Sequence, residues 1–225
     1  MIKFDVITIF PKIFDSYIGE SLIARAIKKK LIKIKAHNLR KWTTNNHQTV
    51  DGRPFGGGLG MVMMVEPIYK AVKFIKLKVK SKKSKVIFFT PRGEVFNQKM
   101  ASKLAKLDQI IFICGRYEGV DERVAENIAD IKLSIGEYDL MGGELPAMVV
   151  METVSRLIPG VIGKEELLKE RVTKNGGFIE YAQYTRPEVF IPKGDKKKWK
   201  VPEVLLSGNH KNIEEWKKAH GKEIL

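Results

Sequence analysis

Cysteine is almost absent from this 225-residue chain, in which Cys114 is the only one. A single cysteine excludes an intramolecular disulfide and argues against a zinc site built on thiolates. Long apolar runs are also missing, since no stretch approaches the roughly 18 consecutive apolar residues of a membrane helix. The first residues, MIKFDVITIF, continue into a predicted strand without a small-residue cleavage site. We therefore expect a cytoplasmic protein with no membrane segment and no bound metal.

Acidic residues are scarce relative to basic ones. Lys and Arg number 41 against 26 Asp and Glu, which gives a net charge of +15 and a pI near 9.7. A field of this sign attracts polyanions, of which nucleic acid is the first candidate. The alternative is a lysine-rich composition spread over solvated faces, and composition alone leaves both interpretations open.

Short apolar runs alternate with amphipathic stretches along the first 160 residues. The predicted strands are 2–10, 32–36, 86–89, 109–113 and 131–133. The predicted helices are 13–27, 67–78, 97–107, 121–129 and 146–157. Strands that alternate with helices of about ten residues indicate a parallel sheet covered on both faces. The predicted fold class is therefore α/β.

This periodicity stops at Pro159-Gly160. A charged stretch follows, and then an aperiodic aromatic segment that closes with an amphipathic run over 213–220. We expect a main domain over residues 1–162, a linker over 163–176 and a small, mostly helical carboxyl-terminal segment over 177–225. About 50 residues bury too little surface for much independent stability, so we expect this segment to dock on the main domain or on a second subunit.

Two glycine-rich runs follow predicted strands about one α/β repeat apart. They are CGRYEGVDERV from Cys114 and SIGEYDLMGGELPAM from Ser134. In open α/β sheets this edge binds ligands, because glycine lets a ligand approach the backbone. Neither run has the spacing of a dinucleotide fingerprint, and GGGLGM at 56–61 lacks the Lys-Ser/Thr pair of a P-loop. The two runs predict a ligand pocket, while Asp121 is better placed as a helix N-cap than as a catalytic group.

Several motifs in one order resemble the bacterial tRNA (guanine-37-N1)-methyltransferase family. They are TVDGRPFGGGLGM, CGRYEGVDERV, SIGEYDLMGGELPAM, VSRLIPGV, YTRPEV and VLLSGNH, and the resemblance runs from the amino terminus to about Trp216. Other knotted methyltransferases share the pocket but not YTRPEV or GRPFGGG. The resemblance implies a trefoil-knotted (SPOUT-type) α/β domain with a small tRNA-binding domain at the carboxyl end. It also implies a homodimer whose active site is completed by the partner subunit.

S-adenosylmethionine is the cofactor that the resemblance implies, held bent between the two loops with its adenine on the backbone of residues 135–140. The expected cofactor-binding residues are Thr90, Pro91, Gly115, Ile135, Gly136, Glu137, Tyr138, Asp139, Leu140, Gly142, Gly143 and Pro146. The resemblance also implies that the substrate is tRNA with guanosine 3′ of the anticodon and that the product is N1-methylguanosine. The expected substrate-binding residues are Asp51, Arg53, Tyr117 and Arg186.

N1 of guanine carries a proton at neutral pH, so methylation needs a base near N1 and a cation near O6, where negative charge grows. Arg156 matches the family's arginine and would stabilise that charge. The alternative is a structural role, in which Arg156 interacts favourably with the dipole at the carboxyl end of its helix. Glu118 would accompany the cationic sulfonium, although a helix cap is its plainer role.

The general base is the point where the chain departs from the family. Counting back from Tyr184-Thr185-Arg186-Pro187 places Val172 where the family has an aspartate, and valine cannot take a proton. Glu170 is our expected base, and Glu180 matches a second acidic position. Two alternatives stay open: a related knotted methyltransferase with another RNA target, and a non-catalytic RNA-binding homologue.

Overall fold

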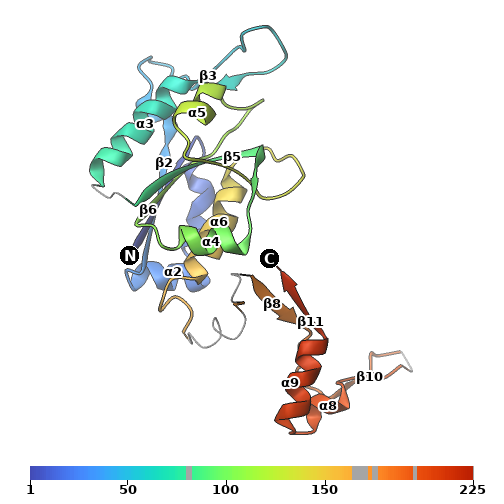
Figure 1. The fold of residues 1–225 in the computed structure, drawn as a ribbon. Helices are drawn as coiled ribbons and strands as arrows, with labels where there is room; N and C mark the ends of the chain where they lie inside the picture. The colour runs from blue at the N-terminus through green and yellow to red at the C-terminus, as the bar shows by residue number, and fades with distance from the viewer. Residues whose placement is uncertain (80–82, 164–171, 174–176, 195–196, 225) are drawn as a thin grey trace. The chain divides into compact units, whose positions relative to one another are not determined.

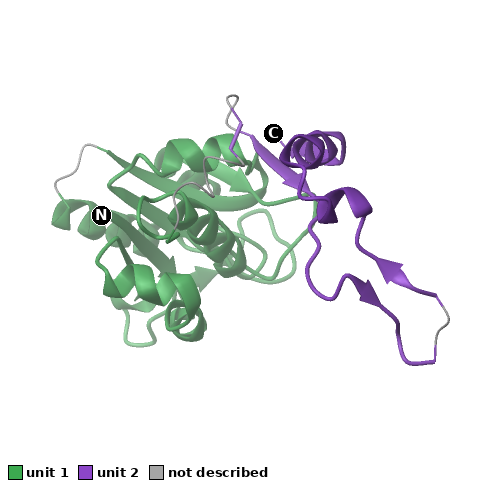
Figure 2. Cartoon of the chain, turned by 90° about the horizontal axis from the view of Figure 1, so that it is seen from below, with its two compact units in different colours: residues 1–166 green, residues 167–225 purple. Residues whose placement is uncertain are grey.

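The computed structural model describes residues 1–79, 83–163, 172–173, 177–194 and 197–224. The chain forms two compact units, residues 1–166 and residues 167–225 (Figures 1 and 2). The strands of unit 1 are β1 (Ile2–Thr8), β2 (Ile32–Asn38), β3 (Asp51–Gly52), β4 (Val62–Met63), β5 (Ser84–Val95), β6 (Gln109–Ile113) and β7 (Ile131–Ser134). Its helices are the 3-10 turns η1 (Pro11–Phe14) and η2 (Leu39–Trp42) and the α-helices α1 (Asp15–Ile18), α2 (Ser21–Lys28), α3 (Val65–Lys78), α4 (Gln98–Leu104), α5 (Glu122–Asn127) and α6 (Glu144–Arg156).

A five-stranded sheet in the order β2-β1-β6-β5-β7 forms the centre of unit 1. Every neighbouring pair in it is parallel, with Phe4 opposite Ile110 and Ile87 opposite Phe112 in the registers. All five residues of β6, the middle strand, are buried. This is the continuous apolar pattern of a strand covered on both faces.

Helices cover both faces of the sheet (Figure 1). Alternate residues of one strand enter different hydrophobic clusters: Phe112 packs with α2, α4 and α6, while Ile111 packs with α3 and α5. The predicted α/β class with a parallel sheet covered on both faces is confirmed.

Strand β5 is longer than predicted. The sequence pattern ends it at Thr90-Pro91-Arg92-Gly93, but the strand continues to Val95 with a register shift between Phe89 and Glu94 against β7. Gly93 makes this possible, because a Cβ there would lie 2.6 Å from the backbone carbon of Leu133. Proline and glycine in the sequence predict the end of a strand, whereas in the structure they form an irregularity within it.

The predicted helix over 13–27 is also wrong in its continuity, since η1, α1 and α2 share this segment. The chain leaves helical geometry at Glu20, whose backbone is extended, and Ser21 then adopts φ +57°. Apolar spacing survives the break, because α1 and α2 face the same hydrophobic cluster.

A buried carboxylate lies within β1. Asp5 is fully buried, and its oxygens are held by His37 Nε2 at 2.7 Å, by Gln109 Nε2 at 2.7 Å and by Lys3 Nζ at 3.0 Å. Burial by itself would raise the pKa of Asp5, but hydrogen bonds from His37, Gln109 and Lys3 outweigh it and hold the pKa below its usual value. The network joins β1 to both of its neighbouring strands.

Unit 2 contains short strands as well as helices, so the expectation of a mostly helical segment is wrong. Its elements are β8 (Phe178–Tyr181), β9 (Val189–Phe190), β10 (Trp199–Lys200), α8 (Glu203–Leu206), α9 (His210–Ala219) and β11 (Gly221–Ile224). β8 pairs with β11 and β9 with β10, both antiparallel. Strands of two to four residues are too short to produce a recognisable alternation.

Candidate functional site

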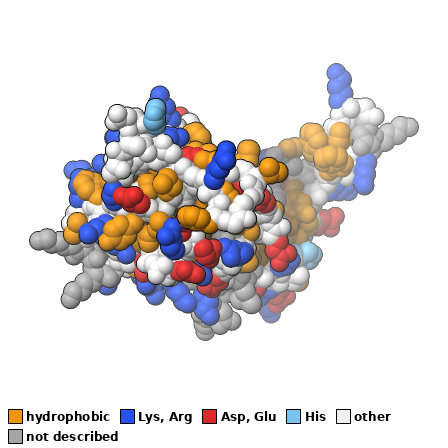
Figure 3. Space-filling model, turned by 90° about the horizontal axis from the view of Figure 1, so that it is seen from above, with side chains coloured by type: hydrophobic (Ala, Val, Ile, Leu, Met, Phe, Trp, Pro, Cys, Tyr) orange, Lys and Arg blue, Asp and Glu red, His pale blue; other side chains and the backbone are white. Residues whose placement is uncertain are grey.

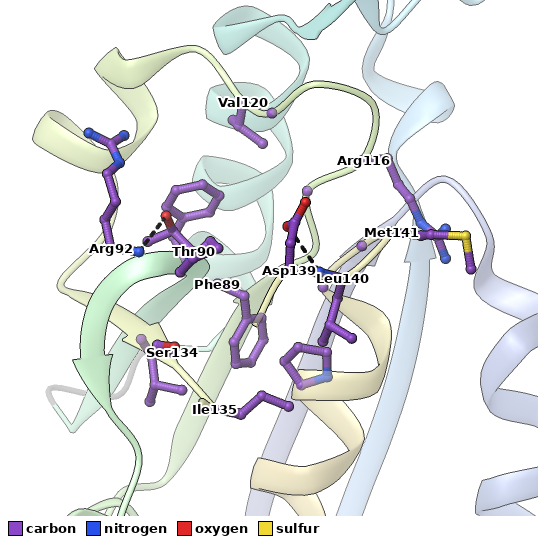
Figure 4. A pocket seen from close by; sticks show the side chains of 18 of the residues that line it. Phe89, Thr90, Arg92, Arg116, Val120, Ser134, Ile135, Asp139, Leu140 and Met141 are labelled. Carbon is purple, nitrogen blue, oxygen red and sulfur yellow. Dashed lines mark hydrogen bonds between the residues drawn. The ribbon is translucent and has the colours of Figure 1, made fainter. Parts of the chain in front are cut away.

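A cavity of about 420 Å³ opens where the two glycine-rich loops follow β6 and β7 (Figure 4). This is the carboxyl edge of the parallel sheet, the usual ligand position in such folds. Its lining comes from three segments: Phe88–Arg92, then Gly115–Val120 with Glu122, and Leu133–Gly136 with Tyr138–Gly143 and Pro146. The predicted pocket between the two loops is therefore present.

Every residue predicted to bind the cofactor lines this cavity except Glu137. Glu118 and Tyr117, which we expected to act on sulfonium and substrate, line it too. Figure 4 shows the rings and alkyl chains of Phe89, Ile135 and Leu140 on its walls. Their roles in binding stay predictions, whereas their gathering around one cavity is a property of the fold.

The first loop, residues 114–121, is held by the β3–β4 ribbon. Met61 O accepts from the Glu118 amide at 3.1 Å, and the Met63 amide donates to Gly119 O at 2.9 Å. Tyr117 adopts φ +61°, a backbone conformation that is uncommon outside glycine. Gly60 lies against the Glu118 side chain. A Cβ at this position would come within 2.9 Å of Glu118 Oε1, so a larger residue would not fit without a shift. The GGGLGM motif thus supports the wall of the cavity that Glu118 forms.

The second loop is tied by its own side chains. Ser134 Oγ donates to Gly136 O at 2.9 Å, and the Tyr138 hydroxyl donates to Ile135 O at 3.1 Å. The Leu140 amide donates to Asp139 Oδ1 at 2.9 Å (Figure 4). Gly143 approaches the first loop closely, donating its amide to Gly115 O at 3.1 Å. These bonds define the shape of the loop.

A buried ion pair between Arg116 and Glu144, which the sequence does not predict, links the two loops. Glu144 is 1% exposed, and its Oε2 accepts from Arg116 Nε and Nη2, both at 2.9 Å. The Thr8 hydroxyl donates to Glu144 Oε1 at 2.6 Å. The Arg116 guanidinium also lies 4.9 Å from the centre of the Phe10 ring. In the sequence, Glu144 is simply a glutamate near the start of a helix. Acidic residues are common there because they interact favourably with the helix dipole, so the sequence does not indicate an ion pair.

Cys114, the lone cysteine, belongs to the core beneath the cavity and is 1% exposed. Burial raises the pKa of its thiol well above the usual value, and the nearby Glu144 charge adds to this effect. A thiol of this kind is inert rather than nucleophilic.

Of the remaining predicted residues, Asp51, Arg53 and Arg156 of unit 1 lie outside the cavity lining. Arg156 ends α6 and lies twelve positions after Glu144, which begins it; at 1.5 Å per residue the two are about 18 Å apart along the helix. Asp51 pairs with Met63 in the β3–β4 ribbon and Arg53 follows it, while Arg186 belongs to unit 2. Glu170 lies outside the described residues.

Asp121 caps α5, as predicted. Its Oδ1 accepts from the Arg123 amide at 3.0 Å, and its carboxylate pairs with the Arg123 side chain at the surface. The Arg123 guanidinium is the main reason that the pKa of Asp121 is below its usual value. At the cavity rim, Arg92 pairs with Glu122, a contact between two exposed side chains that the sequence did not suggest.

Basic and acidic side chains are intermixed on the face of the molecule that Figure 3 shows. Figure 3 looks onto the side that carries α3 and β3, where hydrophobic side chains lie among both basic and acidic ones. Among the residues that the structure describes, no cluster of three or more His, Cys, Asp or Glu side chains could hold a metal ion. None of the described helices has the length and hydrophobicity to cross a membrane.

The fold and the cavity define an α/β protein with a cavity of small-molecule size between two glycine-rich loops, at the carboxyl edge of a parallel sheet. A family model described as "tRNA (Guanine-1)-methyltransferase TrmD" matches residues 2–224, so the chain belongs to this family. The tRNA (guanine-N(1)-)-methyltransferase of Ruminiclostridium cellulolyticum is 49% identical over 96% of this chain and 89% of its own length. The enzyme of that name from Clostridioides difficile is 46% identical over 96% and 90%.

A solved structure is also similar. The tRNA (m1G37) methyltransferase from Aquifex aeolicus superposes with a TM-score of 0.77 at 39% identity, covering 97% of this chain and 88% of that one. The family resemblance read from the motifs is therefore confirmed.

Proposed function

We propose that this protein is an enzyme that transfers a methyl group from S-adenosylmethionine to N1 of guanosine 37 in tRNA. Family membership over residues 2–224 carries the proposal, and the cavity on the two family motifs supports it. The positive net charge of +15 suits a polyanionic substrate.

The cavity suits S-adenosylmethionine in size and chemistry. About 420 Å³ falls within the range of small-molecule sites, which are mostly apolar with a few polar groups. Phe89, Ile135 and Leu140 offer apolar surface for an adenine ring, and the glycines expose backbone amides and carbonyls to it. Glu118 and Asp139 supply negative charge beside the proposed position of the sulfonium. The bound cofactor would supply the electrophilic methyl group.

The protein's own groups would manage the proton and the charge on guanine. A carboxylate removes the N1 proton, and the Arg156 guanidinium stabilises the negative charge that develops on O6. Tyr117, Asp51, Arg53 and Arg186 would hold the nucleotide and its neighbours. We assign the base role to Glu170, since Val172 occupies the position that the resemblance gives to an aspartate.

A trefoil knot and a homodimer complete the proposal. About 18 Å of helix separates Arg156 from the cavity end of α6, which agrees with an active site that a second subunit completes. Apolar side chains on α6 and near the amino terminus are exposed in the single chain: Leu145 60%, Phe10 46%, Val149 42% and Ile13 39%. Such a patch is typical of a surface that a second subunit covers.

We assign tRNA binding to the carboxyl-terminal part, with residues 163–176 as the linker and 177–225 as the binding domain. The β9–β10 ribbon supports this assignment. Its aromatic pair, Phe190 and Trp199, has ring centres 5.6 Å apart and side chains 48% and 56% exposed. Residues 188–201 hold five lysines against two acids. Exposed aromatic rings among lysines suit unpaired bases and phosphates.

The decisive assay uses purified protein, methyl-labelled S-adenosylmethionine and two tRNA transcripts that differ only at position 37, guanosine in one and adenosine in the other. We expect N1-methylguanosine, identified by mass spectrometry of the nucleosides, from the guanosine transcript alone. Product from both transcripts would favour a related methyltransferase with another target nucleotide. Binding of tRNA without product in a single turnover would favour the non-catalytic homologue.

A further inference from the structure

Glu144 occupies an unusual place for a carboxylate that the methylation chemistry does not use. It is 1% exposed, and the side chains that bind its carboxylate come from other segments: Thr8 at the end of β1 and Arg116 in the first loop. Glu144 itself begins α6 directly after the second loop. One carboxylate thus connects the three pieces of backbone that meet under the cavity.

The second loop lies directly on this ion pair. A Cβ at Gly142 would come within 2.6 Å of Arg116 Cδ and 2.7 Å of Glu144 Oε2. Figure 4 shows Arg116 beside Met141, at the margin of the cavity that both residues line. The side chain of Arg116 is 20% exposed, against 2% for Glu144. The cation is therefore the partly open member of the pair, on the side of the ligand.

We propose that Glu144 is a positioning and specificity-determining residue: by pairing with Arg116 it keeps a net positive charge out of the cavity wall, so that the cavity accepts a cationic cofactor. This inference rests on the proposed cofactor. S-adenosylmethionine carries a positive sulfonium, whereas its product S-adenosylhomocysteine has a neutral thioether in the same place. An unpaired Arg116 would repel the first ligand more than the second.

The Glu144→Gln variant tests this difference, because glutamine keeps the shape and an acceptor for Thr8 but loses the charge. We expect the Kd of S-adenosylmethionine to rise roughly tenfold more than that of S-adenosylhomocysteine, the order for a unit charge about 10 Å away at an effective dielectric constant near 20. Calorimetry on the purified variant gives both constants without any turnover. Loss of shape alone would weaken both ligands equally.

A second variant separates charge from packing. In Glu144→Gln/Arg116→Gln the wall is neutral again, so the ratio of the two Kd values should return to that of the wild type even where both affinities are lower. Glu152→Gln is the matched control, since it removes a hydrogen-bonded carboxylate from the same helix but away from the cavity lining. Its ratio should not change.

The inference is overturned if Glu144→Gln loses affinity equally for both ligands. It is also overturned if the ratio of the two Kd values in the double variant stays shifted from that of the wild type. An unchanged affinity of Glu144→Gln for both ligands overturns it as well. Failure of the proposed function has another signature, namely that the wild type itself binds neither ligand. Thermal unfolding of each variant identifies a protein that has not folded. If Glu144→Gln does not fold, Arg116→Gln carries the comparison, because it leaves the Glu144 charge unbalanced and should shift the ratio of the two Kd values in the opposite direction.

Discussion

At the scale of single residues, the general base is the feature on which catalysis depends most. Val172 forms an isolated antiparallel bridge with Phe178 and has no group that could accept a proton. The proposed methylation therefore needs a carboxylate from another position. Our assignment of Glu170 rests on the sequence alone and can be tested by substitution.

Replacing Glu170 by glutamine should lower the single-turnover methylation rate by about 100-fold or more, the usual contribution of a general base. Cofactor affinity should stay the same, because the carboxylate acts only on the guanine proton. Glu180→Gln serves as the comparison, since it removes the other acidic candidate. If Glu180→Gln is the slow variant and Glu170→Gln is not, the base is Glu180.

Cys114 gives a prediction of pH dependence. Its pKa is raised in the fold, while in the unfolded chain it is near the ordinary thiol value of about 9. Above that pH the unfolded state loses a proton that the folded state keeps, so the free energy of unfolding falls as pH rises. Between pH 7 and 10, denaturant titrations should show the advantage of wild type over Cys114→Ala shrinking. A difference that stays constant with pH would contradict the buried, protonated thiol.

At the scale of elements, the sequence predicts a helix or strand well where the apolar pattern extends over the whole element and depends only on neighbouring residues. The strand over 109–113 and the helix over 67–78 follow from runs of apolar residues and appear as β6 and α3. The extension of β5 could not be predicted, because it depends on Gly93 fitting against the Leu133 backbone, a contact about 40 residues away in the chain. The pocket was predicted from its glycines, but Glu144 was not, because its partners Thr8 and Arg116 are distant in sequence.

Gly93→Ala tests the β5 irregularity. The added methyl group would overlap the backbone of β7, which cannot move as a flexible side chain would, so we expect a loss of about 1–3 kcal/mol in the free energy of unfolding. Gly52→Ala, in the short strand β3, is the matched control because a Cβ there meets nothing within 4 Å. Chemical denaturation measures both. If the two variants are equally stable, the backbone of β5 can move away from β7 to make room for a methyl group at position 93, and the prediction is wrong.

At the scale of the whole molecule, the two compact units divide the proposed tasks. Unit 1 holds the cavity that we assign to the cofactor, and unit 2 presents exposed aromatic and basic side chains. Neither hydrophobic core cluster found among the described residues extends into unit 2. Its exposed rings are therefore better explained by a partner than by a core.

The Phe190→Ala/Trp199→Ala variant should weaken tRNA binding by tenfold or more, because each stacked base contributes about 1–3 kcal/mol. Its affinity for S-adenosylmethionine should equal that of the wild type. Phe74→Ala is the control, since Phe74 is 44% exposed and forms a similar ring pair with Trp42 at 5.8 Å, but in unit 1. Fluorescence anisotropy with labelled tRNA measures the affinity of the wild type and of both variants. If Phe190→Ala/Trp199→Ala binds tRNA as tightly as the wild type, the β9–β10 ribbon is not part of the tRNA-binding surface.

The place of β1 in the sheet has a consequence for synthesis. Its neighbour β6 begins at Gln109, whose side chain bonds to Asp5 across a separation of 104 residues. At ~5–20 residues per second, a ribosome needs about 5–20 s to make the chain between them. For that time the first strand can pair only with β2, and Asp5 lacks its bond from Gln109. A ribosome that stalls before Gln109 therefore leaves an apolar strand with one free edge.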